Sequence, residues 1–387
     1  MAIFAGLLDF LGLNAVGAPP FSPASFYSLV LFSFKTWPFL SPLLSKINAP
    51  HGRFSFDSIL NVNGNLAWFL MEIPSPLMFL AAVSSPPLSH EVRIATDSTW
   101  PSLPSLLSPS LRGFLSLPSA NQVLALLYLT HYLHRAVLSP LRSPRRSAMH
   151  ISVPLFAIVF NLINGFLMGS WIGGRSPWSA LPTAASASAV AAASHLPDAV
   201  TRSALFSKLS GSLAKPQALD GLAFSAPGLI PSSVWSSPLW YLGLAGWAIG
   251  FASNVWHDEI LLNLRRPKAG DKQEKGDEKA GKPKYEVPYG GLYRFISYPN
   301  YASEWFEWFS YSLAAIHALP LFSTASLSTA AGLKDLVATL TSIPPFLFAL
   351  VEVSVMLPRA VNGHKWYQKT FGERYPRERK AVIAFVL

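Results

Sequence analysis

Ionisable side chains inside long apolar stretches are the residues of this sequence best suited to take part in a reaction. Glu72 interrupts the segment AWFLMEIPSP. An ionisable group in an apolar environment is costly unless it is paired, so such residues are functional candidates by default. Two interpretations of Glu72 stay open at this point. It either pairs with a neighbouring helix for packing, or its apolar setting keeps the carboxyl protonated and able to donate a hydrogen bond.

A second polar group combines His131, Tyr132, His134 and Arg135 at the end of another apolar stretch. The two histidines have i, i+3 spacing and share a helix face. No nearby carboxylate completes a set of metal ligands with them, so we expect no metal. Tyr132 either belongs to the aromatic belt of a membrane interface or projects its hydroxyl into the bundle as a donor. The Arg135 side chain could extend to lipid headgroups.

Two further groups place polar side chains three, four or seven residues apart, which puts them on one helix face. They are Asn254, Asp258 and Arg265 in one stretch, and Asn300, Glu304 and Glu307 in the other. The last 29 residues, from Arg359, add seven basic residues and several aromatic ones. This tail is either an amphipathic segment on lipid headgroups or a phosphate-binding lid over the mouth of a bundle.

The common catalytic motifs do not account for these groups. The sequence has no G-x-G-x-x-G, Walker A, G-x-S-x-G or H-E-x-x-H motif. It also has no cysteine, which excludes disulfides, thiolate metal sites and a cysteine nucleophile.

The elements that hold these residues are predicted to be membrane helices. Of the 387 residues, 51% are hydrophobic and only 13% are charged, against about 25% charged in soluble proteins. Seven windows have about the 20 residues that a membrane-spanning helix needs. They are Phe26–Leu44, Asn65–Val83, Ser119–Leu138, Ile151–Gly174, Pro238–Leu262, Glu304–Phe322 and Leu336–Leu357. Pro74 and Pro76 should kink the second of them.

The basic residues predict an orientation for these helices. With the N-terminus on the lumenal side, the cytosolic segments carry 21 Lys and Arg residues and the lumenal segments carry seven. This asymmetry follows the positive-inside rule. The predicted fold class is therefore all-α, a polytopic membrane protein with seven transmembrane helices, a lumenal N-terminus and a cytosolic C-terminus.

We predict one membrane domain over 1–387. Within it, residues 65–174 form the N-terminal half of a substrate pocket, and residues 238–387 form a C-terminal, cofactor-binding half. Residues 175–236 are rich in Ala, Ser and Pro and are predicted to be a low-complexity lumenal insertion. Residues 266–284 are predicted to be a charged, flexible cytosolic linker.

Several segments together resemble the steroid 5α-reductase family. The family signature is a Pro-x-Gly-Gly-Leu turn, an Asn before an E-x-x-E-W helix, and a basic C-terminal ending. This sequence has YEVPYGGLYRFISYPNYASEWFEWFSYSL at 285–313 and LPRAVNGHKWYQKTFGERYPRERKAVIAFVL at 357–387. The segments AWFLMEIPSP, THYLHRAVLSPLR and NVWHDEILLNLRRP also resemble the family. Ala384 and the sequence Asn362-Gly363-His364 depart from it, at a family proline and at a His-rich stretch.

The resemblance implies a seven-helix membrane reductase that uses NADPH without a dinucleotide-binding domain of the usual kind. It implies that Glu72 and Tyr132 are the catalytic pair, which holds the C3 carbonyl oxygen of a 3-oxo-Δ4 steroid. The implied cofactor-binding residues are Arg146, Asn254, Asp258, Arg265, Tyr285, Asn300, Glu304, Arg359, His364 and Tyr367. The implied substrate-binding residues are Trp68, Phe160 and Tyr301.

The expected partners are a steroid or another lipophilic enone and membrane lipid, with no nucleic acid, and we expect a monomer in the endoplasmic reticulum membrane. Three alternatives stay open. The first is a reductase of another enone, such as a very-long-chain 2-enoyl-CoA or a polyprenal. The others are a membrane methyltransferase that uses S-adenosylmethionine, and a non-enzymatic sterol-binding protein.

Overall fold

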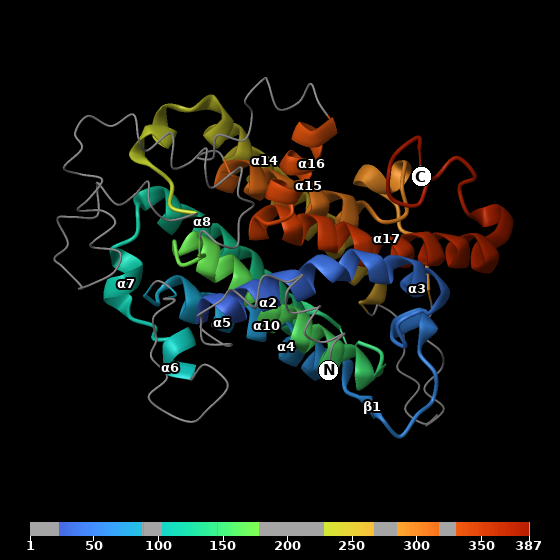
Figure 1. The fold of residues 1–387 in the computed structure, drawn as a ribbon. Coiled ribbons are helices and arrows are strands. Elements are labelled where there is room, and N and C mark those ends of the chain that lie inside the picture. The colour runs from blue at the N-terminus through green and yellow to red at the C-terminus, as the bar shows by residue number, and fades with distance from the viewer. Residues whose placement is uncertain are drawn as a thin grey trace, which may run out of the picture.

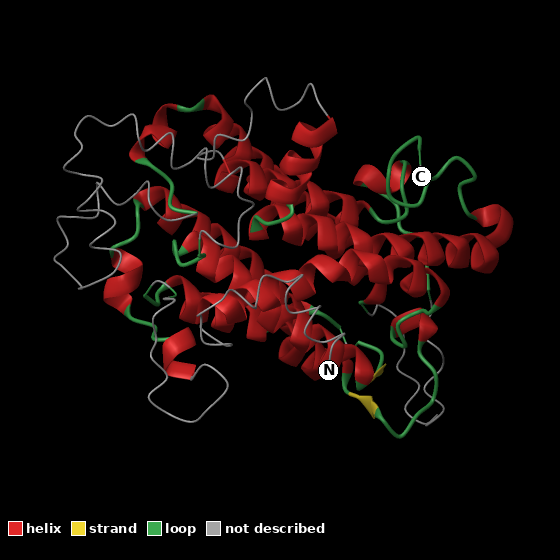
Figure 2. Cartoon of the chain, viewed as in Figure 1, coloured by secondary structure: helices red, strands yellow, loops and turns green. Residues whose placement is uncertain are grey.

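The computed structural model describes residues 23–86, 88, 103–144, 146–177, 228–266, 285–316 and 330–386. Most of the predicted insertion 175–236 and of the linker 266–284 lies outside these residues. The described chain is mostly helical, with two short strands (Figure 2). The N-terminal elements are α2 (Pro23–Thr36), η1 (Trp37–Leu40), α3 (Ser41–Lys46), η2 (Gly52–Phe54), β1 (Asn61–Val62), α4 (Gly64–Glu72), α5 (Pro74–Val83), α6 (Leu103–Leu106) and α7 (Leu111–Leu115). They are followed by α8 (Ser119–Tyr132), η3 (Leu133–Leu138), α9 (Ser139–Arg142), β2 (Met149–His150) and α10 (Ser152–Ile172). The C-terminal elements are η6 (Ser232–Ser236), α14 (Pro238–Arg265), η7 (Gly291–Arg294), α15 (Pro299–Ile316), α16 (Ala330–Leu340), α17 (Pro344–Phe371) and η8 (Gly372–Arg374).

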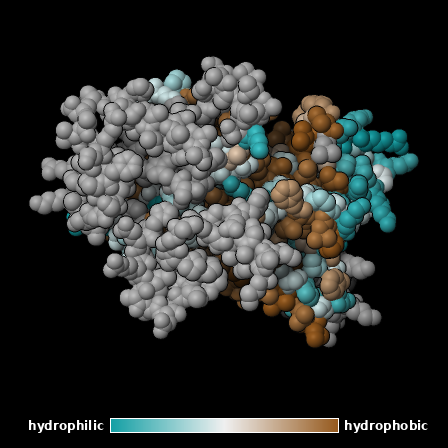
Figure 3. Space-filling view, viewed as in Figure 1, coloured by the Kyte–Doolittle hydropathy of each residue, from teal (hydrophilic) through white to brown (hydrophobic). Residues whose placement is uncertain are grey.

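The prediction of a helical protein is confirmed. Three helical stretches of the described chain are long and apolar enough to cross a membrane: Gly64–Val83, Ser152–Ile172 and Pro344–Arg374. Apolar side chains such as Leu77, Val159 and Ile249 also remain exposed on the outer faces of the bundle. In Figure 3, apolar residues cover the middle of the visible described surface, and hydrophilic residues gather around the end of α17.

Proline positions decide where the predicted windows break. The expected kink lies at Ile73, where α4 ends and α5 begins with Pro74 at its first position. Proline lacks the N–H that a continuing helix needs, but it is well suited to a first turn. Pro38 breaks the first window in the same way, into α2, the 3₁₀ turn η1 and α3.

The last predicted window was wrong at both ends. The chain turns after α16, and α17 begins at Pro344 and continues to Phe371. It runs through Pro358 and past Arg359, from which the sequence analysis counted the basic tail. Pro358 is buried in the bundle, and tertiary packing can offset the hydrogen bond that an interior proline removes. The first part of the basic tail is therefore a rigid extension of a core helix.

Helix α10 packs closely against α5 because its contact face consists of glycines. Gly165, Gly169 and Gly173 are spaced four residues apart, as in the small-residue faces of membrane helices. A Cβ atom on Gly169 would lie 2.6 Å from the carbonyl oxygen of Phe79, and one on Gly165 would lie 2.4 Å from that of Ser75. Neither glycine therefore has room for a side chain, and the close approach brings polar groups of the two helices into contact.

Replacing Gly169 by Leu is expected to destabilise the protein by about 1–3 kcal/mol, since the side chain must push the two helices apart. Thermal unfolding in detergent would measure the loss. Val159→Leu is the matched control, because Val159 lies on the same helix with half of its surface exposed. Equal melting temperatures for the two variants would contradict the packing argument.

A second closely packed pair is formed by α14 and α15, which run antiparallel. Gly243 of α14 lies against Ala314, and Gly250 lies against the backbone of Glu307. Helix α17 packs on α15, and α2 lies between α10 and α17 (Figure 1). Aromatic side chains fill the core where these helices meet α8, as shown by Tyr128 stacked at 4.0 Å on Phe79.

Short backbone pairings fix the loops at one end of the bundle. Strands β1 and β2 are antiparallel, with Asn61 opposite His150. Ile296 forms a parallel bridge with Lys380, which holds the C-terminal segment beside the start of α15. The first pairing brings the loops after α3 and after α9 together at the end of the bundle where α4 begins.

Candidate active site

Arg135 is the centre of a buried polar cluster between three helical elements. Its Nε atom lies 3.1 Å from Oε1 of Glu72, at the end of α4. Its Nη1 atom lies 2.9 Å from Oε1 of Glu304, in α15. Arg135 belongs to η3, a π-helical turn that continues α8, and such turns often occur at functional sites. Arg135 therefore does not extend to lipid headgroups, which was one of the options left open by the sequence.

The cluster extends from Glu304 to a second buried pair. His131 Nδ1 lies 2.7 Å from Oε1 of Glu307, and its Nε2 lies 3.7 Å from Oε1 of Glu304. The imidazole packs against the Trp308 ring, with centroids 4.7 Å apart. The sequence analysis did not predict His131 as a site residue, although its position one residue before Tyr132 was a usable signal.

Tyr132 ends α8 and is buried, with an exposed fraction of 2%. Its hydroxyl oxygen accepts a hydrogen bond of 2.9 Å from Nδ2 of Asn164 in α10. The hydroxyl lies 3.5 Å from Oδ1 of Asn161. Tyr132 therefore projects into the bundle and does not belong to an interfacial aromatic belt.

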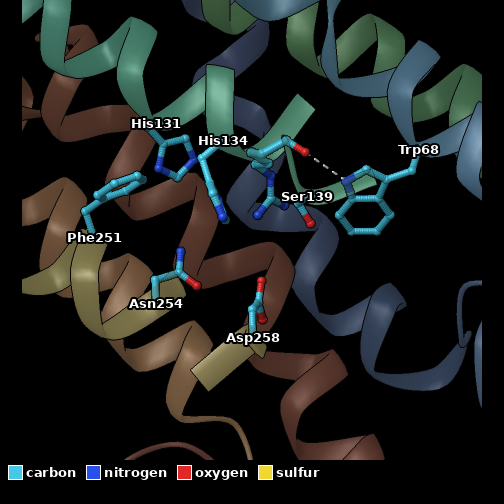
Figure 4. A pocket seen from close by; sticks show the side chains of 8 residues that line it. Trp68, His131, His134, Ser139, Phe251, Asn254 and Asp258 are labelled. Atoms are coloured by element: carbon cyan, nitrogen blue, oxygen red, sulfur yellow. Dashed lines mark hydrogen bonds between the residues drawn. The ribbon is translucent and has the colours of Figure 1, made fainter. Parts of the chain in front are cut away.

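A small pocket opens beside this cluster, with an empty volume of about 300 Å³ when its mouth is included. Asn254 and Asp258 reach into it from α14, opposite His131 and His134 (Figure 4). Trp68 forms another wall, and its Nε1 donates a 3.2 Å hydrogen bond to the carbonyl oxygen of Arg135. The remaining lining residues are Arg135, Ser139 and Phe251. The pocket thus joins predicted substrate residues to predicted cofactor residues.

Arg146 lies over the ring of Trp68, with its guanidinium carbon 4.3 Å from the ring centroid. Its Nη2 donates to Oγ of Ser143 at 2.9 Å. Burial and the positive charge of Arg265 lower the pKa of Arg146 to about 10. Two arginines close enough to repel each other favour an anionic ligand between them.

Arg53 is a second basic residue at this end of the bundle, and the sequence analysis did not predict it as a site residue. Its guanidinium carbon lies 4.5 Å from the ring centroid of Tyr367 and 4.6 Å from that of Trp366. Tyr285 lies 5.8 Å away on another side. Burial raises the pKa of Tyr285, although the charge of Arg53 opposes this shift. In the sequence, only the aromatic residues of the tail and the basic residue at position 53 could have indicated this contact.

His51 shows that this end of the bundle has excess positive charge. Burial and the charges of Arg359, Arg53 and Arg146 lower the pKa of His51 to about 4. Several buried nitrogen atoms here have no hydrogen-bond partner among the described residues, namely His51 Nδ1, Arg53 Nη1, Arg146 Nε and Arg359 Nε. Buried donors without partners are costly, and phosphate oxygens would satisfy them. The residues present therefore fit the phosphate groups of a dinucleotide.

The remaining predicted residues fall into three places. Asn300, in the first turn of α15, donates a 2.9 Å hydrogen bond to Asp258 and so borders the pocket. Tyr301 packs against Tyr298 in a small cluster with Met356. Phe160 lies in an aromatic group with Phe34, Trp37 and Phe348.

His364 has no recorded contact with the pocket residues. Its Nδ1 lies 2.6 Å from Oγ of Ser297, and its ring lies beside Tyr375. These contacts hold the C-terminal segment against the start of α15. The structure thus gives His364 a role in fixing the tail, in addition to any contact that a bound cofactor would make.

The fold and the site define a class of protein: a helical bundle with apolar helices of membrane-spanning length, a buried Arg–carboxylate cluster and a basic mouth. Comparison with known proteins identifies the family. The sequence profile described as 3-oxo-5-alpha-steroid 4-dehydrogenase matches residues 199–334 and 336–387. The chain belongs to the steroid 5α-reductase family, which confirms the resemblance.

Relatives match over most of their length. An uncharacterized protein of Schizosaccharomyces pombe is 31% identical over 88% of this chain and 92% of its own length. The steroid 5-alpha-reductase DET2 of Solanum lycopersicum is 24% identical over 94% of this chain and 98% of its own. The 3-oxo-5-alpha-steroid 4-dehydrogenase 1 of Bos taurus is 25% identical over 89% of this chain and 90% of its own.

Proposed function

We propose that this protein is an NADPH-dependent reductase of the Δ4 double bond of a 3-oxo-Δ4 steroid or a closely similar lipophilic enone. One observation carries the proposal: the guanidinium of Arg135 contacts both Glu72 and Glu304. The family resemblance implies that Glu72 binds the substrate and that Glu304 binds the cofactor. A single, partly exposed side chain thus joins the two sites at which an enone and a hydride donor have to meet.

The residues of the chain have two tasks in this reaction. The cofactor, when bound, supplies a hydride to C5 of the enone. As the hydride is added, negative charge grows on the carbonyl oxygen, and donors aimed at that oxygen are usually the largest catalytic contribution. The Tyr132 hydroxyl supplies one donor. A protonated carboxyl can supply another, as in the ketosteroid isomerase site described for a different fold.

Glu72 can act as that second donor while it contacts Arg135. The guanidinium donates to Oε1, which leaves Oε2 to carry a proton and to donate it in a hydrogen bond to the carbonyl oxygen. Arg135 would fix the orientation of the carboxyl, and the same guanidinium would hold Glu304 on the cofactor side. A proton added at C4, from solvent or a nearby acid, completes the saturated ketone.

The basic mouth supports NADPH as the cofactor. Arg146 and Arg265 have the mutual repulsion that a 2′-phosphate would relieve, and Arg53 and Arg359 have buried nitrogen atoms suited to phosphate oxygens. Asn254, Asp258 and Asn300 would hold the part of the cofactor that enters the pocket. Tyr285, His364 and Tyr367 complete the proposed cofactor set on the side of the tail.

We further propose that the chain crosses the membrane of the endoplasmic reticulum seven times, with α17 as the last crossing and the basic mouth facing the cytosol. The positive-inside asymmetry supports this orientation, and it would place the cofactor site on the side where NADPH is available. The lipophilic substrate would enter from the surrounding lipid, and the protein would act as a monomer.

The test is NADPH oxidation by the purified, detergent-solubilised protein with progesterone or testosterone, with products separated by mass. We expect a product that has gained two hydrogens in the ring. The matched control substrate is the corresponding 5α-reduced ketone, which has no double bond to reduce and should give no oxidation. Activity only with a 2-enoyl thioester or a polyprenal would assign the alternative enone reductase, and no NADPH binding would overturn the proposal.

A further inference from the structure

Asn164 is the centre of a buried polar group that the sequence analysis did not predict. It lies in α10 with an exposed fraction of 0%. Its Nδ2 atom lies 2.9 Å from the Tyr132 hydroxyl, 3.0 Å from the Tyr128 hydroxyl and 3.4 Å from Oγ of Ser75. Two helices, α5 and α8, therefore place polar side chains around one amide of α10 in an otherwise apolar core.

The close contact of two helices creates this group. Gly165, the neighbour of Asn164, lets the backbone of α5 approach closely. A Cβ atom added to Gly165 would lie only 2.4 Å from the Ser75 carbonyl oxygen. Ser75 and Asn164 are brought together by this approach. Tyr128 and Tyr132 reach the same place because they lie one turn apart on α8.

The count of hydrogen atoms decides where the Tyr132 proton points. An amide nitrogen carries two hydrogens, and a hydroxyl carries one. The oxygens of Tyr128 and Tyr132 accept the two amide hydrogens. The Tyr128 hydroxyl has Oγ of Ser75 at 2.6 Å as a partner for its own hydrogen. The hydrogen of Tyr132 remains to be placed.

Asn161 is a weak acceptor for that hydrogen. Its Oδ1 lies 3.5 Å from the Tyr132 hydroxyl, beyond the usual range of an O–H···O hydrogen bond. Its amide is held in orientation because Nδ2 donates to the Met71 carbonyl oxygen at 2.6 Å. The hydroxyls of Ser75 and Tyr128 also lie near the Tyr132 hydroxyl, but no hydrogen bond of normal length among the described residues takes its hydrogen, which is therefore available to a ligand.

We propose that Asn164 is a positioning residue that acts through Tyr132, an inference that rests on the proposed function. By donating to the Tyr132 oxygen, the amide directs the hydroxyl hydrogen away from α10 and towards the substrate carbonyl. The same hydrogen bond polarises the phenol and makes it a stronger donor as the oxyanion develops. Asn164 itself does not touch the substrate.

A packing role alone does not account for this amide. Asn164 Oδ1 is buried and has no hydrogen-bond partner among the described residues. An unsatisfied buried acceptor costs about 1–3 kcal/mol, which an apolar side chain of the same size would avoid. The donor end of the amide is the part that the site uses.

The test is Asn164→Asp, which keeps the shape of the side chain and removes its donor. The ionised carboxylate can only accept, so the Tyr132 hydrogen would turn towards position 164 and away from the substrate. Because burial raises the pKa of a carboxyl, the kinetics are measured at a pH high enough to ionise it. We expect kcat for enone reduction to fall by about 10²-fold, with NADPH affinity unchanged. Asn164→Leu removes the donor without adding a charge, and its kcat should fall by at least about tenfold. This variant serves as the test if Asn164→Asp does not fold.

A double-mutant cycle separates positioning from structural damage. If Asn164 acts through the Tyr132 hydroxyl, Asn164→Asp and Asn164→Leu should cost little further activity in a Tyr132→Phe background. Additive losses would show general damage and overturn the inference. Activity of Asn164→Asp equal to that of the unsubstituted protein would also overturn it, because the amide would then be accepting and not donating.

The inference and the proposed function can fail separately. Turnover by the unsubstituted protein with no effect of Asn164→Asp removes only the inference. If the unsubstituted protein binds progesterone without turning it over, the double-mutant cycle is measured as progesterone affinity instead of kcat. Asn164→Asp should then weaken binding only where Tyr132 is present. Absence of both binding and turnover would overturn the proposed function and the inference together.

Discussion

Tyr132→Phe is expected to lower kcat for enone reduction by about 10²–10³-fold, the usual cost of removing one donor to a developing oxyanion. The hydroxyl is buried among α8 and α10 side chains, so water does not readily replace it. NADPH affinity should stay unchanged, because the Tyr132 hydroxyl contacts Asn161 and Asn164, neither of which is a predicted cofactor residue. Steady-state kinetics with progesterone and equilibrium NADPH binding would measure the two effects. Glu72→Gln should show the same split.

Tyr128→Phe is the matched control for this prediction. Tyr128 lies one turn earlier on the same helix, is equally buried, and accepts the other hydrogen of the same Asn164 amide. Its hydroxyl and that of Ser75 share a 2.6 Å hydrogen bond, so it is already engaged within the protein. We expect its kcat to stay within a few-fold of the unsubstituted protein. Equal losses in Tyr128→Phe and Tyr132→Phe would show that the phenol at position 132 has no special role.

Arg135→Met is expected to destabilise the protein by about 3–5 kcal/mol, the usual cost of removing one partner from a buried ion pair. Without the guanidinium, the carboxyl groups of Glu72 and Glu304 would face each other in the core with their shared partner lost. Their side chains are only 6% and 3% exposed, so solvent cannot compensate. Chemical unfolding in detergent, followed by tryptophan fluorescence, would measure the change.

Arg142→Met is the control for the loss of a nearby arginine. Arg142 pairs with Glu259 at 3.0 Å, but its side chain is 51% exposed, and exposed pairs contribute at most about 1 kcal/mol. Combining Arg135→Met with Glu72→Gln and Glu304→Gln should recover part of the lost stability, because no buried charge is then left unpaired. A stability loss in Arg135→Met no larger than that of Arg142→Met would show that the cluster is already well solvated.

The elements of the fold were largely predictable, because apolar length and proline positions are local properties. The windows 65–83 and 151–174 match observed helical stretches to within a few residues. The error at the last window has a physical reason. Pro344 and Pro358 are the same residue type, but one starts a helix and the other lies inside it. Only the burial of Pro358 between packed helices decides that the chain stays helical there.

The candidate site was predictable in composition but not in its contacts. Glu72, Tyr132 and Glu304 were selected from their residue types in apolar segments and from the family resemblance. Arg135 was assigned an alternative role at the headgroups, because the distance from Glu72 to Arg135 in sequence says nothing about their distance in space. Arg53 was missed for a similar reason, since its aromatic partners lie more than 230 residues further along the chain.

The sequence by itself determined a helical bundle, the membership of its family and the residue types of its polar site, because periodicity, apolar length and motifs are written along the chain. The tertiary structure decided which of those polar groups meet. The glycines of α10 allow an approach that sets Asn164 against Tyr132, and the π-helical turn places Arg135 between Glu72 and Glu304. Such contacts depend on helix separation and rotation, which no local pattern in the sequence encodes.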